Sequence, residues 1–323
     1  MKRDKNQKLH TVYLVNIIIM CLISLASLGG ILYLTLMGGK YSDRDLDKAR
    51  KQGREELLLE MEASFQGGTD TLKVIRNLYP DKIVIDDYGS YSFYSMQEAA
   101  LNGFSAEDFS KGENGILSYQ GQDYSSARTG IDVNENTISI DYGKIRDQGL
   151  EFVCIYAGRF NSRQEFLSDE TFSDHLLRAG EAGLETSLYV TLNARNAEAG
   201  REEAEYLVSY LEPWKERFGG EIALQVIYPS RDPANDIARL GYTESLLSAC
   251  SVLSEAGYQP IICADSKTFC GLLDLAQLED YPRWLQEYGD CPYFPYRFSM
   301  WRYGAAIQLD GVEGSVFLDL KFE

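Results

Sequence analysis

The chain has 323 residues, of which 45% are hydrophobic and 25% charged, and this composition excludes a chain that is disordered over most of its length. Its formal net charge of -18 argues against a nucleic-acid partner, because binding to phosphates needs clustered lysine and arginine. The two histidines, His10 and His175, and six cysteines without a CxxC pair offer no recognisable metal site. We therefore predict no metal and no cofactor, and expect carboxylates, hydroxyls and aromatic side chains to carry any chemistry.

An uncharged and mostly apolar segment runs from Thr11 to Met37. A helix of that length, at about 1.5 Å per residue, would cross a hydrocarbon core of roughly 30 Å. Four basic residues and one acidic residue precede it, so the positive-inside rule predicts a cytoplasmic tail over residues 1–10, a transmembrane helix over 11–37 and an extracellular remainder. The chain would then be a single-pass protein of the cell membrane. The alternative is a cleaved signal peptide, whose apolar region normally spans only about 7–15 residues.

Two smaller segments follow the apolar one. Residues 41–66 are rich in charge and predict a juxtamembrane stalk helix or weak coiled coil, with Ser42 as its N-cap. Residues 71–125 predict a small α+β connector: a short helix, then an alternating segment with a turn at Asp87–Gly89, which is typical of a hairpin. No catalytic constellation is recognisable in the connector.

The pattern changes over residues 126–323, where short β-rich runs alternate with amphipathic helices. Strands are expected over 129–133, 151–158, 185–192, 221–228 and 259–264, and helices over 142–148, 170–182, 197–211 and 242–256. Glycine follows three of these helices, at Gly149, Gly183 and Gly257, as at a helix C-cap. Such alternation over about 195 residues predicts an α/β fold with a (β/α) TIM-like barrel. Because the last segment has strand patterns without helices, we expect the barrel to be irregular.

The order and spacing of these pieces resemble glycoside hydrolase family 25, the lysozyme-type muramidases, from Thr129 to Phe322. Eight short segments in the right order carry the resemblance: TGIDV (129–133), EFVCIYAG (151–158), AGL with SLY (182–189), EA (203–204), AGYQP (256–260), WL with Tyr288 (284–288), MWRY (300–303) and DGVEG (310–314). The resemblance implies a barrel whose acidic cleft binds peptidoglycan and cuts the glycan after N-acetylmuramic acid. Catalytic groups in such a barrel belong at the carboxyl ends of the strands.

The acidic positions depart from the family pattern. The family's fourth strand ends in Asp-x-Glu, two side chains that point the same way, and here Gln225 and Ile227 align with them. On the last strand Phe317 aligns with the family's Asp and Asp319 with its Asn, so that Asp132 is the one acid matched in place. Neither an amide nor a hydrocarbon can protonate the leaving oxygen, and losing general acid catalysis typically costs about 10²–10⁴-fold in rate.

These matches predict a degenerate site. Asp132 and Asp319 are the candidate catalytic pair, although Asp132 can equally be a structural, hydrogen-bonded carboxylate. The candidate glycan contacts are Tyr156, Tyr189, Gln225, Trp301, Arg302 and Tyr303. Core packing is the alternative for the aromatic residues, and for Arg302 an ion pair with Asp132 or Asp319. Acids that follow strand ends and could replace the missing ones are Glu135, Asp232 and Asp236.

Three functional hypotheses follow. The leading one is a membrane-anchored, lysozyme-like barrel outside a bacterial cell that binds or senses peptidoglycan, with hydrolysis lost or much weakened, as in a pseudoenzyme. The second is an active muramidase with a rearranged acid. The third is a protein-interaction module of the cell envelope, in which stalk and connector bind another envelope protein.

Overall fold

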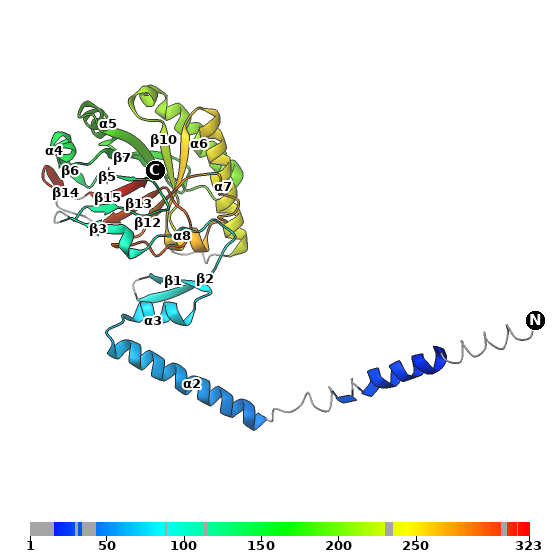
Figure 1. Cartoon of the computed structure of the whole chain (residues 1–323). Helices are drawn as coiled ribbons and strands as arrows, with labels where there is room; N and C mark the ends of the chain where they lie inside the picture. Colours follow the sequence, from blue (N-terminus) through cyan, green and yellow to red (C-terminus); the bar gives the residue numbers. More distant parts are fainter. Residues whose placement is uncertain are drawn as a thin grey trace, which may run out of the picture. The chain divides into compact units, whose positions relative to one another are not determined.

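The computed structural model describes residues 16–29, 32–33, 43–87, 89–112, 115–229, 235–304, 309–314 and 316–323. The chain divides into two compact units, Met1–Val74 and Ile75–Glu323, and each is described by itself. The second unit contains the barrel (Figure 1).

Most of the described part of the first unit is helical. Residues 16–29 and 32–33 are helical, and α2 (Asp43–Gln66) is one helix, as predicted for the stalk, with no buried residue. The predicted tail 1–10 and parts of the predicted span 11–37 lie outside the described residues. Among the residues that are described, no helix combines the length and apolar character needed to span a bilayer. The transmembrane helix therefore stays a prediction.

Eight strands form the barrel, as the alternation of strand and helix patterns predicted. Their order around the barrel is β5 (Ala127–Val133), β15 (Phe317–Phe322), β13 (Met300–Gly304), β12 (Arg283–Gln286), β11 (Gln259–Asp265), β10 (Glu221–Gln225), β9 (Glu185–Thr191) and β7 (Phe152–Phe160). Pairing of β5 with β7 closes the barrel, and β8 (Phe166–Ser168) extends β7 as a hairpin. All pairings in the ring are parallel except those of β15, which runs antiparallel to β13 and β5. This reversal is the irregularity expected from the helix-free last segment.

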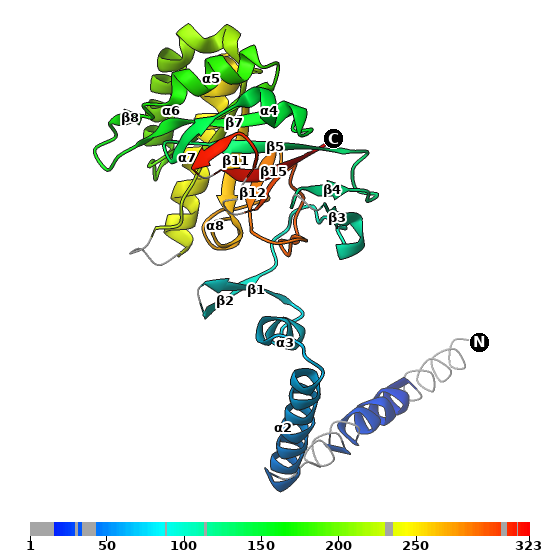
Figure 2. The same ribbon diagram turned by 90° about the vertical axis from the view of Figure 1, so that its left-hand side faces the viewer.

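The helices cover the outside of the strands, as Figures 1 and 2 show for α5, α6 and α7. They are α4 (Tyr142–Asp147), α5 (Phe172–Glu181), α6 (Ala197–Leu211), α7 (Asp236–Glu255) and the short α8 (Ser266–Gly271), with a 3₁₀ helix at Glu212–Arg217. The three glycines predicted to end helices have φ between +80° and +88°. α7 begins six residues before the predicted start because Asn235 caps it, accepting a hydrogen bond from the Ala238 N–H at 2.9 Å.

Several small elements precede or flank the barrel. They are α3 (Thr71–Leu78), the hairpin β1 (Lys82–Asp87) and β2 (Ser90–Ser95), a 3₁₀ helix at Ala106–Asp108, and the pairs β3 (Phe109–Lys111) with β4 (Leu117–Tyr119) and β6 (Thr137–Ile140) with β14 (Val312–Gly314). The predicted hairpin is thus present.

Much of the predicted connector packs on the barrel. The amide of Asn102 donates to the Phe294 and Tyr296 carbonyls at 2.7 and 2.9 Å, and the Phe109 ring lies 5.3 Å from that of Trp301. From Ile75 onward the predicted connector therefore belongs to the same compact unit as the barrel. The other predicted domain boundaries stay predictions.

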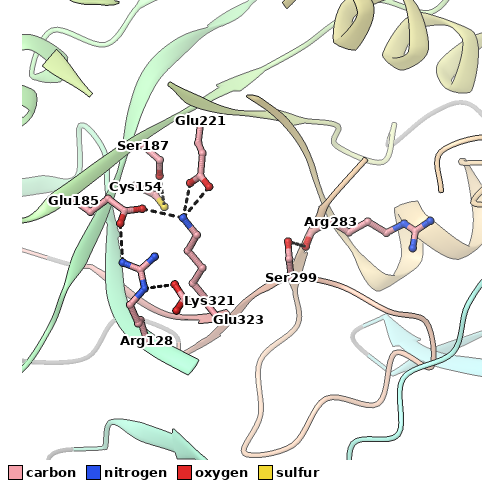
Figure 3. A network of polar contacts seen from close by, with 9 residues as sticks. All are labelled: Arg128, Cys154, Glu185, Ser187, Glu221, Arg283, Ser299, Lys321 and Glu323. Carbon is pink, nitrogen blue, oxygen red and sulfur yellow. Dashed lines mark hydrogen bonds and ion pairs between the residues drawn. The ribbon is translucent and has the colours of Figure 1, made fainter. Parts of the chain in front are cut away.

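Ion pairs close the amino-terminal end of the parallel strands (Figure 3). Lys321 lies 2.7 Å from Glu221 and 2.9 Å from Glu185, the first residues of β10 and β9. Arg128 on β5 lies 2.7 Å from Glu185 and 2.6 Å from Glu323. Charged side chains from four strands thus pair with one another at this end. We therefore expect a binding site at the opposite end, where the parallel strands have their carboxyl ends.

Candidate functional site

Uncharged polar side chains form a hydrogen-bonded chain towards the carboxyl ends of five neighbouring strands. Thr191 on β9 donates to the amide oxygen of Gln225 on β10 at 2.7 Å, and Tyr156 on β7 lies 3.1 Å from the Thr191 hydroxyl. The Gln225 amide nitrogen donates to the Gln286 oxygen on β12 at 3.2 Å, and Gln286 donates to the Cys263 sulfur at 3.0 Å. We call these five residues the neutral belt. Both ends of the Gln225 amide are engaged, and no member of the belt is a carboxylic acid.

A buried charge cluster lies inside the barrel, made of Asp132, Asp319 and Arg302. Both aspartates have no exposed surface, and Arg302 is 6% exposed. The Arg302 Nε lies 2.7 Å from Asp132 Oδ2. The Trp284 indole donates to Asp319 Oδ1 at 2.8 Å, and the Tyr189 hydroxyl donates to Asp132 Oδ1 at 3.3 Å. The predicted pair of carboxylates is therefore brought together, but away from solvent.

One guanidinium faces two carboxyl groups in this cluster, and this determines where a proton resides. Burial, followed by the negative charge of Asp132, raises the pKa of Asp319 well above its ordinary value, while Arg302 offsets only part of the rise. Burial also raises the pKa of Asp132, against the opposing effect of Arg302. Burial lowers the pKa of Arg302, but the two carboxylates outweigh it and the guanidinium stays charged. The cluster therefore favours one shared proton, carried by Asp319 and giving no net charge.

We predict that the free energy of unfolding depends less steeply on pH in Asp319→Asn than in the wild type. Because the folded pKa is raised, the folded chain keeps a proton that the unfolded chain loses above about pH 4. The wild type should then lose stability as the pH rises from about 4 through the folded pKa, by up to about 1.4 kcal/mol per pH unit. Asparagine keeps an oxygen that can accept from Trp284 but has no proton to lose. Urea unfolding of both proteins between pH 5 and 8, followed by near-ultraviolet circular dichroism, measures the difference.

The control for this prediction is Asp310→Asn. The Asp310 side chain is 74% exposed and pairs with Lys144 at the surface, so its removal should leave the slope unchanged. Parallel pH profiles of wild type and Asp319→Asn would contradict a shared proton in the cluster.

An aromatic pair lies next to the charge cluster. The rings of Tyr288 and Phe317 are parallel within 11° with centroids 6.0 Å apart, and the Arg302 guanidinium carbon lies 4.9 Å from the Phe317 ring centre. Phe317 is half-buried and Tyr288 is 59% exposed. Ile227, two residues after Gln225, is 61% exposed. The two positions aligned from the sequence with an Asp-x-Glu pair thus hold an engaged amide at the end of β10 and an exposed hydrocarbon two residues beyond it.

The predicted glycan contacts separate into three groups. Tyr156 and Gln225 are half-buried members of the neutral belt. Tyr189 and Arg302 are buried in the barrel interior. Trp301 and Tyr303 are buried on the opposite face of β13, where the Tyr303 hydroxyl accepts from the Leu117 N–H at 3.1 Å.

The structure therefore corrects the expectation for Trp301 and Tyr303. Successive side chains on a strand point to opposite faces, so the neighbours of the inward-facing Arg302 must face outward. There they pack under β3 and β4 and present no ring to the belt.

Of the acids considered as replacements, Glu135 acts on a belt residue through its charge. Its negative charge contributes to the raised pKa of Tyr156, whose main cause is burial. Asp236 is the first residue of α7, and Asp232 lies outside the described residues. Glu287 is held by its neighbours, since it accepts hydrogen bonds from Ser266 and from the Tyr293 N–H. Among the described residues no cluster of three or more potential metal ligands occurs.

Three members of the belt, Thr191, Cys263 and Gln286, were missed from the sequence. A signal was available, because Thr191, Gln225 and Gln286 are the last residues of three parallel strands, and such residues meet at one rim. The role of Trp284 as the donor to Asp319 was also missed.

Comparison with known proteins gives a consistent result. The family model described as "Glycosyl hydrolases family 25" matches residues 131–312, more than half of the chain. No curated protein matches the chain by sequence. Among solved structures, the autolysin LytC from Streptococcus pneumoniae is 15% identical with a TM-score of 0.54, over 75% of this chain and 58% of LytC. The catalytic domain of endolysin ply40 from bacteriophage P40 of Listeria monocytogenes is 14% identical with a TM-score of 0.51, over 63% of this chain and 95% of that domain.

The CTP1L endolysin is 15% identical with a TM-score of 0.48, over 59% of this chain. The chain spans 65% of that endolysin, so both it and LytC extend well beyond the part that is matched.

Proposed function

Because the chain belongs to glycosyl hydrolase family 25, we propose that its barrel binds peptidoglycan glycan strands at the neutral belt, with hydrolysis lost or strongly weakened. One observation carries the proposal. The two positions aligned with the family's Asp-x-Glu pair hold Gln225, whose amide is hydrogen-bonded at both ends, and Ile227, whose exposed side chain has no proton to give.

The candidate catalytic pair, Asp132 and Asp319, is poorly suited to replace the missing donor. A general acid must come within about 2.6–3.2 Å of the glycosidic oxygen. Asp132 and Asp319 have no exposed surface and are engaged by Arg302 and Trp284. A sugar would reach them only after the aromatic and charged side chains around them had moved.

The ligand class is supported by a structural relative. LytC is described in complex with a synthetic peptidoglycan ligand, and its fold is similar to that of this chain. Carboxylates, which a hydrolase needs, are not required for holding a sugar, since amides and hydroxyls at a rim can form hydrogen bonds with its hydroxyl and acetamido groups.

The cellular setting is part of the proposal. An anchor over residues 11–37 with the basic tail inside would hold the barrel at the outer surface of the cell membrane, facing the wall. In this setting a non-hydrolysing barrel would tether or sense glycan, and its partners would be the lipid bilayer and peptidoglycan.

A binding assay with a separate hydrolysis readout tests the proposal. The full chain in detergent micelles is incubated with purified peptidoglycan sacculi, and both sedimentation and new reducing ends are measured. We expect co-sedimentation, with reducing ends released at least about 10²-fold more slowly than by an active family 25 enzyme. Release near the rate of the active enzyme would refute the loss of hydrolysis. Absence of co-sedimentation would favour the protein-interaction module instead.

An active muramidase with a relocated acid is the second candidate, and the charge of Glu135 near Tyr156 favours it. In that case Glu135→Gln should abolish any reducing-end release that the wild type shows. If hydrolysis is lost, as we propose, the variant and the wild type should be indistinguishable.

A further inference from the structure

The substitution of an acid by Phe317 changes what the barrel rim can bind. Phe317 is paired in register with Asp132 on β5, so its ring lies beside the charge cluster. It forms the parallel pair with Tyr288, and the guanidinium of Arg302 lies against it. The ring therefore contacts both a buried cation and an exposed tyrosine.

The charges of the buried cluster are hidden from a ligand. Arg302 is paired with Asp132 and buried, and its closest aromatic neighbours are Phe317 and Trp284, each 4.9 Å from the guanidinium carbon. The belt residues that are half-buried, Tyr156, Thr191, Gln225 and Gln286, are all uncharged. A carboxylate-bearing ligand would give up its hydration here without gaining a cation among these belt residues, while the charges of Arg159 and Glu135, which both act on Tyr156, oppose each other.

Two kinds of surface therefore meet at the rim. The Tyr288–Phe317 pair offers apolar ring surface, and the belt offers the amides of Gln225 and Gln286. Gln286 is paired in register with Arg302, whose guanidinium lies over the Phe317 ring. A pyranose ring has the matching combination, with an apolar face of C–H groups and an edge of hydroxyl and acetamido groups. Binding sites for small polar ligands commonly combine an aromatic wall with a few placed polar groups.

We propose that the Tyr288–Phe317 pair is a stacking platform for an uncharged N-acetylhexosamine ring. The proposal rests on the glycan binding proposed above and makes it specific. At this platform Phe317, which stands where the family has an acid, acts as a binding residue. The preferred sugar is the neutral N-acetylglucosamine unit, and a carboxylate-bearing sugar is disfavoured.

The test uses chitotetraose, an uncharged oligomer of N-acetylglucosamine, as the probe. Binding to the full chain in detergent micelles is measured by isothermal titration calorimetry. Phe317→Leu keeps an apolar side chain but removes the ring, and we expect about tenfold weaker binding; Phe317→Tyr should bind like the wild type. Tetragalacturonate, a carboxylate-bearing oligomer, should bind at least about tenfold more weakly than chitotetraose.

Two further variants test whether weaker binding is specific to the Tyr288–Phe317 pair or follows from the loss of any partly exposed aromatic ring. Tyr288→Leu changes an exposed side chain and should also weaken chitotetraose binding, even if Phe317→Leu disturbs folding. Phe93→Leu is the matched control, because Phe93 is 45% exposed and packs on Tyr79 with ring centres 4.8 Å apart, but lies on the separate β1–β2 sheet. It should bind like the wild type.

The results distinguish this inference from the proposed function. If the wild type does not bind chitotetraose, or if the Phe317→Leu and Tyr288→Leu variants bind as tightly as the wild type, the platform is refuted. Equal affinity for tetragalacturonate refutes its preference for uncharged sugars. Glycan binding and loss of hydrolysis are tested separately, by sedimentation with sacculi and by the reducing-end assay. Their outcomes do not depend on the results with chitotetraose, the variants or tetragalacturonate.

Discussion

Replacing Arg302 by methionine is expected to lower the free energy of unfolding by about 3–5 kcal/mol. The guanidinium is the cation that faces Asp132 and Asp319 in the barrel interior, and both carboxyl groups have no exposed surface. Removing it leaves Asp132 either as an unpaired buried charge or as a second protonated acid. Urea unfolding of the full chain at pH 7 measures the loss.

A surface ion pair provides the control. Arg201 lies 2.6 Å from Glu205 on α6, with side chains 48% and 53% exposed, so Arg201→Met should cost less than about 1 kcal/mol. Adding Asp132→Asn to Arg302→Met should recover part of the loss, because the unpaired charge is then gone. A cost below about 1 kcal/mol for Arg302→Met would mean that the cluster does not depend on its cation.

Restoring the acids is expected to have the largest effect on activity. Gln225→Asp combined with Ile227→Glu should raise the release of reducing ends from sacculi by at least about 10²-fold over the wild type. The two positions are separated by one residue at the end of β10, and the exposed Ile227 leaves room for a glutamate without burying its charge. An aspartate at 225 can accept from Thr191, as the Gln225 amide oxygen does.

The matched control for the acid pair is Gln225→Asn with Ile227→Gln, which has nearly the same shape and no acid. It should leave hydrolysis at the wild-type level. A third change, Phe317→Asp, restores the remaining family acid, and it should raise the rate of the doubly substituted chain further. Equal activity of the amide control and the acid pair would show that something other than proton donation limits the reaction.

Most barrel elements could be predicted because their signals are local. The strands over 185–192 and 259–264 and the helix over 197–211 were placed to within one residue, since apolar runs bounded by glycines or caps specify them. β12 has only four residues, and α8 only six, and neither was assigned from periodicity, because such short segments carry too few positions for a pattern. The antiparallel orientation of β15 could not be predicted in the same way, because it depends on pairing with β13 and β5, and pairing between strands is not a local property.

The site was predicted less well than the fold. The sequence suggested that Asp132 and Asp319 could form a pair, and the structure brings them together. Asp319 on β15 is paired in register with Gly130 on β5, two residues before Asp132. For Trp301 and Tyr303 the sequence left glycan contact and core packing open, and the structure shows core packing. The alternation of side chains on either side of Arg302 is consistent with this. What covers them, the segment with β3 and β4, comes from almost 200 residues earlier in the chain, and no local pattern indicates that contact.

The position of Trp284 has a practical consequence. Its indole donates to Asp319 and lies 4.9 Å from the guanidinium carbon of Arg302, so the electric field at the indole depends on whether the carboxyl group holds its proton. Indole emission is sensitive to such fields, and the chain has only two other tryptophans. The barrel thus contains its own optical reporter, through which loss of the interior proton can be followed without an attached dye.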